Sequence, residues 1–300
     1  MLVRVMEGVE DVPEIVMTTG LPWDWETFPQ YLDSLQERQC DIDFATHIPH
    51  SAIRVYVMGM RGAAREPATP LELRQMKELV RDAVRAGAIG VSSSQSSGHR
   101  TVDFLALTKQ AQADGLPVKA QVFPRPMGLL FGLELSLHPF RFHPSYKAIE
   151  ALSLAERVEA MRDPQRRKAI LSEKPSHSNP FTLALVTQYD LAFPMTDPPD
   201  YEPPVEKTLG AMARQRGISL AELAYDMLLE REGKALLVNP IANFAEGNLD
   251  ATHTMLVDEH TLVGLGDGGA HYGMICDASF PSTLLSYWAR DRAKDRVPIE

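Results

Sequence analysis

A short glycine-rich segment carries the side chains best placed to do chemistry. Asp267 and His271 stand in the run from Gly264 to His271, directly after an apolar stretch typical of a buried strand. Glycines let the backbone approach a ligand closely, and α/β barrels carry catalytic groups at the carboxyl ends of their strands. Asp267 is therefore the leading catalytic candidate. In the alternative interpretation, Asp267 caps a turn and His271 bonds a nearby carbonyl.

The elements that would position this segment alternate between helix and strand. Thr69 and Glu72 can form a capping box around Pro70, so a helix is predicted from Pro70 to a helix-ending Gly87. Further helices are predicted at residues 102–113, 219–232, 250–257 and 281–292. Strands are predicted at 42–48, 88–93, 117–122, 235–238 and 261–266, with weaker candidates near 15–18 and 182–187.

This alternation predicts a parallel α/β sheet. The clear strands fall short of the eight that close a standard barrel. A proline-rich connector at residues 197–204 separates the two halves and is expected to be a linker or a loop over a barrel mouth. Two smaller expectations concern aromatic and imidazole rings. Trp23 and Trp25 are expected to pack at a barrel edge rather than bind substrate, and His138 and His143 to serve as packing or lid residues.

Several stretches of the sequence are similar to one enzyme family. The segment 264–271, continued by 275–279 and 288–292, resembles the last barrel strand and loop of the N-acyl-D-amino-acid deacylases (D-aminoacylases) of the amidohydrolase superfamily. Further stretches resemble that family in the same order, at residues 6–13, 20–28, 54–59, 61–69, 197–203 and 226–229. The resemblance therefore spans nearly the whole chain.

The resemblance implies a fold and a reaction. The fold is α/β, a single amidohydrolase-like domain over residues 1–300 that forms an incomplete (β/α)8, TIM-barrel-like, metal-dependent hydrolase. The reaction is hydrolysis of the non-peptide C–N amide bond of N-acyl (D-)amino acids by a metal-activated water, with zinc as the implied cofactor. Asp267 matches the aspartate that contacts the metal or its water and passes a proton to the leaving amine.

The sequence also departs from the family pattern. It has no His-x-His pair. Its residues Met6 to Val9, near its start, match a stretch that in the family follows the first barrel strand, and its run from Gly98 to Asp103 looks shortened relative to the family. The flanking β-sandwich of relatives is absent, so the chain is expected to be truncated at both ends and internally. A catalytically inactive remnant that lacks the metal ligands is accordingly the alternative to an active hydrolase.

Histidines and arginines elsewhere could complete a site. His47 and His50 follow a predicted strand, and His99 follows another, so these three join Asp267 as candidate metal ligands. The commoner fate of such histidines is a hydrogen-bonded loop position. Arg100 and Arg125 could hold a substrate carboxylate in a two-pronged contact, with His271 as a third substrate-binding candidate; ordinary structural pairing is the alternative for both arginines.

Composition limits the class of protein. The chain of 300 residues has 30 basic and 40 acidic side chains, a formal charge of −10, which argues against a general nucleic-acid binder. Two cysteines are too few for a disulfide scaffold. No stretch reaches the length of a membrane helix and no leader is evident, so a cytoplasmic protein with a small-molecule substrate is expected. An incomplete barrel exposes strand edges, which predicts self-association.

Overall fold

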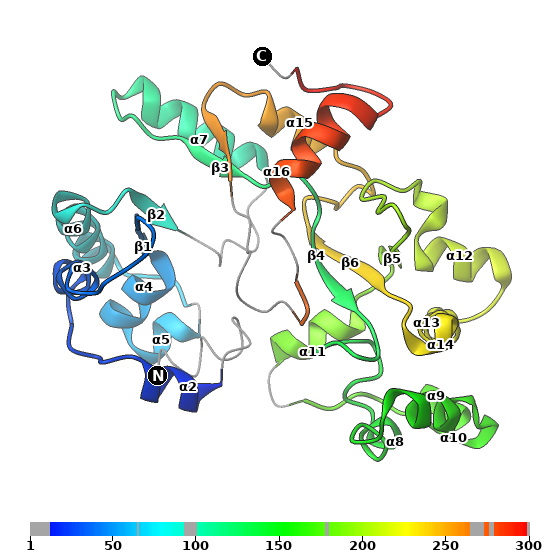
Figure 1. The fold of residues 1–300 in the computed structure, drawn as a ribbon. Coiled ribbons are helices and arrows are strands. Elements are labelled where there is room, and N and C mark those ends of the chain that lie inside the picture. The colour runs from blue at the N-terminus through cyan, green and yellow to red at the C-terminus, as the bar shows by residue number, and fades with distance from the viewer. Residues whose placement is uncertain are drawn as a thin grey trace. The chain divides into compact units, whose positions relative to one another are not determined.

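The computed structural model describes residues 13–64, 66–92, 101–177, 180–264, 273–275 and 279–298, with backbone alone at 101–104 and 180–181. The chain falls into two compact units, residues 1–99 and 100–300. The chain is mixed α/β, with small sheets among many helices (Figure 1). Whether the two units form parts of one barrel stays a prediction.

The first unit places helices around one pair of parallel strands (Figure 1). Strands β1 (His47–Pro49) and β2 (Gly90–Ser92) pair with His47 opposite Gly90. The core of this unit joins Ile48 from β1 to Ile53 from helix α4 (His50–Met58) and to Met76 and Ala83 from helix α6 (Pro70–Ala86). The helices are α2 (Glu14–Gly20), α3 (Phe28–Gln36), α4 (His50–Met58), α5 (Met60–Ala63) and α6 (Pro70–Ala86).

The predicted capping box of α6 is confirmed. The Thr69 hydroxyl accepts from the Glu72 amide at 3.3 Å, and the Glu72 carboxylate accepts from the Thr69 amide at 2.7 Å. Gly87 then ends the helix at a φ of +121°, a conformation that favours glycine. The weak strand candidate near 15–18 was wrong, because these residues lie in helix α2.

The described residues of the second unit form two sheets. Strands β3 (Ala120–Val122) and β7 (Thr261–Val263) are parallel, whereas β4 (Met127–Phe131) and β5 (Phe193–Pro194) both pair antiparallel with β6 (Leu237–Ala242). The helices are α7 (Thr101–Ala113), α8 (Pro144–Lys147), α9 (Leu154–Arg162), α10 (Pro164–Ser172), α11 (Pro180–Thr187), η1 (Val205–Lys207), α12 (Leu209–Arg216), α13 (Leu220–Leu228), α14 (Glu230–Gly233), α15 (Asp250–Leu256), α16 (Phe280–Thr283) and the π-helical η2 (Leu284–Asp291).

These sheets correct the expectation of a wholly parallel one. The predicted strand at 235–238 is β6, which extends to Ala242 and pairs antiparallel with β4. Strand β4 was not predicted, because the prolines before it indicated irregular structure, although the run from Met127 to Phe131 is continuously apolar. The weak strand candidate near 182–187 was wrong, since these residues form helix α11.

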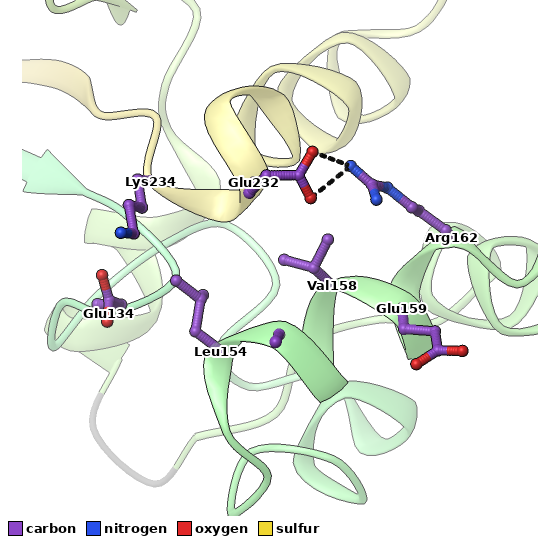
Figure 2. A pocket seen from close by; sticks show the side chains of 8 residues that line it. Glu134, Leu154, Val158, Glu159, Arg162, Glu232 and Lys234 are labelled. Carbon is purple, nitrogen blue, oxygen red and sulfur yellow. Dashed lines mark hydrogen bonds and ion pairs between the residues drawn. The ribbon is translucent and has the colours of Figure 1, made fainter.

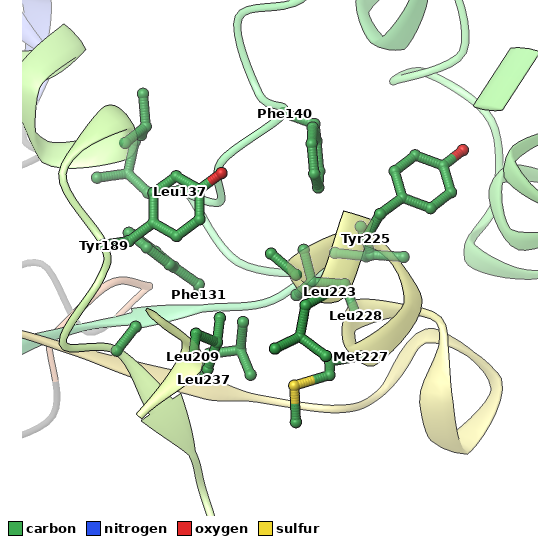
Figure 3. Close-up of a cluster of buried hydrophobic side chains, with 14 of the residues drawn as sticks. Phe131, Leu137, Phe140, Tyr189, Leu209, Leu223, Tyr225, Met227, Leu228 and Leu237 are labelled. Carbon is green, nitrogen blue, oxygen red and sulfur yellow. The ribbon is translucent and has the colours of Figure 1, made fainter. Parts of the chain in front are cut away.

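The main core of the second unit packs against the antiparallel sheet. Figure 3 shows Phe131 and Leu237 from the paired strands together with Phe140, Leu223 and Tyr225.

Within the described ranges, no helix is both long and apolar enough to cross a membrane. On β7, Leu262 and Val263 are 54% and 40% exposed, and self-association through such edges stays a prediction.

His138 gives this core a pH dependence. Its side chain is fully buried, and its Nδ1 accepts from the Phe140 amide. Burial, reinforced by the charges of Arg141 and Arg157, lowers the pKa of His138 to about 3. An unfolded histidine binds a proton below pH 6.5 that the folded one does not, so stability is lost as the pH falls below that value.

We expect the free energy of unfolding to fall by about 2 kcal/mol between about pH 7.5 and pH 5 because of His138 alone. Urea denaturation at the two pH values measures this. His138→Gln keeps a hydrogen-bond acceptor but does not titrate, so it is expected to remove that part of the loss. An equal loss in the wild type and the variant would contradict the assignment to His138.

Candidate functional site

The parallel strands β3 and β7 end at one edge of their sheet. Val122 lies opposite Val263 in the register, and the Gly264 amide donates to the Val122 carbonyl at 2.9 Å. Both strands therefore end at the same edge. The segment that leaves β3 carries Arg125, and the segment that leaves β7 carries Asp267 three residues beyond Gly264.

The loop after β3 is fixed by contacts along its backbone. The Asn243 side-chain amide donates to the Phe123 carbonyl at 3.1 Å, and the indole of Trp288 donates to the Pro124 carbonyl. All residues from Val122 to Pro126 are buried. Hydrogen bonds from Asn243 and Trp288 hold this short loop, and with it Arg125, in a defined position. A binding residue requires such a fixed position.

Arg125 brings a permanent positive charge into this buried environment. It is 3% exposed, its guanidinium lies 4.6 Å from the Tyr201 ring and 5.5 Å from the Phe123 ring, and one Nη donates to the Ser279 hydroxyl at 3.3 Å. A guanidinium stays charged at any ordinary pH and offers a planar fork of donors that matches a carboxylate. The chemistry of the Arg125 side chain therefore suits a carboxylate, and its role in substrate binding stays a prediction.

Tyr201 reaches Arg125 from the proline-rich connector. The neighbouring Glu202 accepts two hydrogen bonds from the buried Arg292, at 2.9 and 3.1 Å, and a third from the Leu249 amide at 2.7 Å. Tyr287 donates to the same carboxylate. The connector is thus anchored to helix α15 and the C-terminal segment, and it is not a free linker.

The charges around Glu202 favour its ionised form. Burial would raise the pKa of the Glu202 carboxyl, but the hydrogen bonds from Arg292, Tyr287 and Leu249 outweigh this and hold the pKa below its ordinary value. Arg292 also donates to Asp250 at 2.7 Å and lies 4.7 Å from the Trp288 ring. Since Trp288 holds the Arg125 loop, one network supports both Arg125 and Tyr201.

Two of the candidate metal ligands, His47 and His50 in the first unit, lie among the described residues. His47 begins β1, and its ring lies against Gly90, where an added Cβ would be 2.8 Å from the ring Cδ2. His50 begins α4, and burial together with the charge of Arg54 lowers its pKa, which favours the neutral imidazole. In the part of the chain that the structure describes, no three His, Cys, Asp or Glu side chains group so as to hold a metal.

Four candidates fall outside the described residues. They are Asp267 and His271 after β7, and His99 and Arg100 after β2. Their roles stay predictions from the sequence.

A shallow hollow of about 740 Å³ lies elsewhere in the second unit, on α9 and the turn before β6. Figure 2 shows its apolar floor of Leu154 and Val158 beside an ion pair between Arg162 and Glu232 at 3.2 Å. It contains none of the candidate residues.

Sequence reasoning missed the residues that surround Arg125. Tyr201, Ser279 and Asn243 are separated from it by 76 to 154 positions, and no spacing rule joins residues so far apart. The available signals were the connector itself and the stretches at 275–279 and 288–292, which the family resemblance singled out as segments without assigning roles to the side chains that contact Arg125. Arg125 itself was a candidate because its guanidinium can make a two-pronged contact with a carboxylate, and that role stays a prediction.

The chain has no match among the protein-family models, the curated proteins or the solved structures with which it was compared.

Proposed function

We propose that this chain is an amidohydrolase-like hydrolase that cleaves the non-peptide C–N amide bond of N-acyl amino acids. The observation that carries the proposal is the buried guanidinium of Arg125 at the edge where β3 and β7 both end. It supplies the charge that a substrate carboxylate needs, and the segment with Asp267 starts from the same edge.

In the proposed reaction, Arg125 binds and orients the carboxylate of the substrate. The oxygen of a water molecule attacks the carbon of the amide carbonyl, and Asp267 accepts a proton from that water. Asp267 then returns the proton to the amide nitrogen as the C–N bond breaks. The products are a carboxylic acid and a free amino acid. Zinc is implied only by the family resemblance, and the described side chains do not supply its ligand set, so no step of the proposal depends on it.

The test is release of free amine from N-acetyl-D- and N-acetyl-L-amino acids by the full chain, with and without added zinc. Elemental analysis of the dialysed protein measures metal content in parallel. We expect amine release from at least one stereochemical series. No release from either series, with zinc present and the protein folded, would overturn the proposal in favour of a catalytically inactive relative.

A further inference from the structure

The first unit carries a row of aromatic rings that the proposed hydrolase site does not use. We call Trp23, Trp25, Phe28 and Tyr31 the aromatic row. Trp23 stacks on Trp25 with ring centroids 5.9 Å apart and planes 28° from parallel. Trp25 lies 5.3 Å from Tyr31, which lies 5.8 Å from Phe28. The rings therefore form one continuous series of contacts.

The row runs from the core of the unit to its surface. Phe28 packs against the core cluster around Ile48, whereas Trp23 is 44% exposed. Trp23 has a φ of +52°, which is uncommon for a residue other than glycine, and its indole donates to the Met17 carbonyl at 3.2 Å. The sequence favours a packing role for the two tryptophans, but the fold leaves much of Trp23 in solvent.

Carboxylates flank the row. Asp24 and Glu26 stand on either side of Trp25 in the chain; Asp24 accepts from the Ser34 hydroxyl and Glu26 from the Tyr56 hydroxyl, each at 3.1 Å. These bonds fix the carboxylates without neutralising them. Residues 13–49 hold a single basic side chain, Arg38, against seven acidic ones, Glu14, Asp24, Glu26, Asp33, Glu37, Asp41 and Asp43.

The chemistry of this surface selects its partner. The face of an indole attracts a guanidinium or an ammonium, and nearby carboxylates strengthen that attraction. The same charges repel nucleic acid and acidic proteins, including a second acidic copy of this chain. We propose that the aromatic row, with Asp24 and Glu26, is a docking surface for a peptide segment that carries arginine or lysine. This surface is independent of the proposed hydrolase activity.

Tryptophan fluorescence tests the proposal directly. The chain has three tryptophans, and the third, Trp288, is fully buried in the other unit, so a change on titration reports on Trp23 and Trp25. The probe is an acetylated, amidated hexapeptide of alternating glycine and arginine, and the comparison is the same peptide with glutamate. We expect a saturable change with the arginine peptide only, with a dissociation constant of about 100 μM at low salt that rises with added salt.

Variants separate this surface from a general charge effect. The double variant Asp24→Asn with Glu26→Gln is expected to weaken binding about tenfold, and Trp23→Ala about fivefold, with Trp25 as the remaining reporter. The matched control, Glu78→Gln with Asp82→Asn, removes two carboxylates from helix α6 of the same unit and is expected to change binding less than twofold.

Three results would overturn the proposal. They are no saturable change with the arginine peptide, an equal response to the glutamate peptide, and equal weakening by the α6 control. If Trp23→Ala does not fold, the Asp24 and Glu26 double variant decides, since it alters only exposed side chains. Dimer formation that depends on Trp23 and is unaffected by the arginine peptide would assign the surface to self-association instead.

Discussion

Asp267→Asn is expected to lower kcat/KM for N-acyl amino acids by about 10² to 10⁴-fold. Asparagine keeps the size of the side chain and its acceptor oxygen, but its amide cannot take a proton from the attacking water. The proton must then leave by a slower route, and the amine departs without a positioned donor. Initial rates of amine release at several substrate concentrations measure kcat and KM separately.

A matched replacement shows whether this loss is specific. Asp114→Asn makes the same chemical change at the exposed end of helix α7, where Gln110 donates to the carboxylate at 2.9 Å. It is expected to leave kcat/KM unchanged. An Asp267→Asn protein that keeps more than half of the wild-type kcat/KM would remove Asp267 from the catalytic assignment.

Glu202→Gln is expected to lower the free energy of unfolding by about 3 to 5 kcal/mol. The Arg292 side chain is 1% exposed, and Glu202 accepts two of its hydrogen bonds. Loss of the Glu202 carboxylate leaves this buried cation with the half-exposed Asp250 as its only anionic partner among the described residues. The neutral amide also removes a charged acceptor from Tyr287 and the Leu249 amide. Urea denaturation at neutral pH measures the loss.

Two comparisons define the cause of that loss. Arg290→Met breaks an exposed pair with Asp291 and is expected to leave the free energy of unfolding nearly unchanged, because solvent screens exposed ion pairs. Replacing both buried partners, as Glu202→Leu with Arg292→Met, is expected to recover at least half of the stability lost by Glu202→Gln, because no charge is then left unpaired. A cost below about 1 kcal/mol for Glu202→Gln would show that the network contributes little to stability.

Local signals in the sequence were sufficient for many of the elements. The capping box at Thr69 and the glycine at position 87 predict both ends of helix α6, because the atoms concerned lie within one turn of the chain. Strands β3 and β7 were also predicted, each as a short segment that follows a helix. Parallel pairing followed from the alternation of helix and strand.

Other features depend on contacts between distant residues. Strand β4 follows two prolines and gains its partner from β6, more than 100 positions away. Helices α2 and α11 are short apolar runs, for which sequence patterning alone does not distinguish helix from strand. At the candidate site, Arg125 was named for the two-pronged contact that a guanidinium can make with a carboxylate. Its contact with Tyr201 was not predicted, because it depends on a connector anchored by Glu202 and Arg292, 90 positions apart.

The most direct test of the proposed site compares two substrates on two proteins. The substrates are an N-acetyl amino acid and its carboxamide, which lacks the carboxylate. The proteins are the wild type and Arg125→Met, in which an uncharged side chain of similar length replaces the guanidinium. We expect the wild type to prefer the carboxylate by at least about tenfold in kcat/KM, and Arg125→Met to bring that ratio close to one. A ratio unchanged by Arg125→Met, or a folded wild type that hydrolyses neither substrate, would contradict a carboxylate-binding hydrolase site at the edge of β3 and β7.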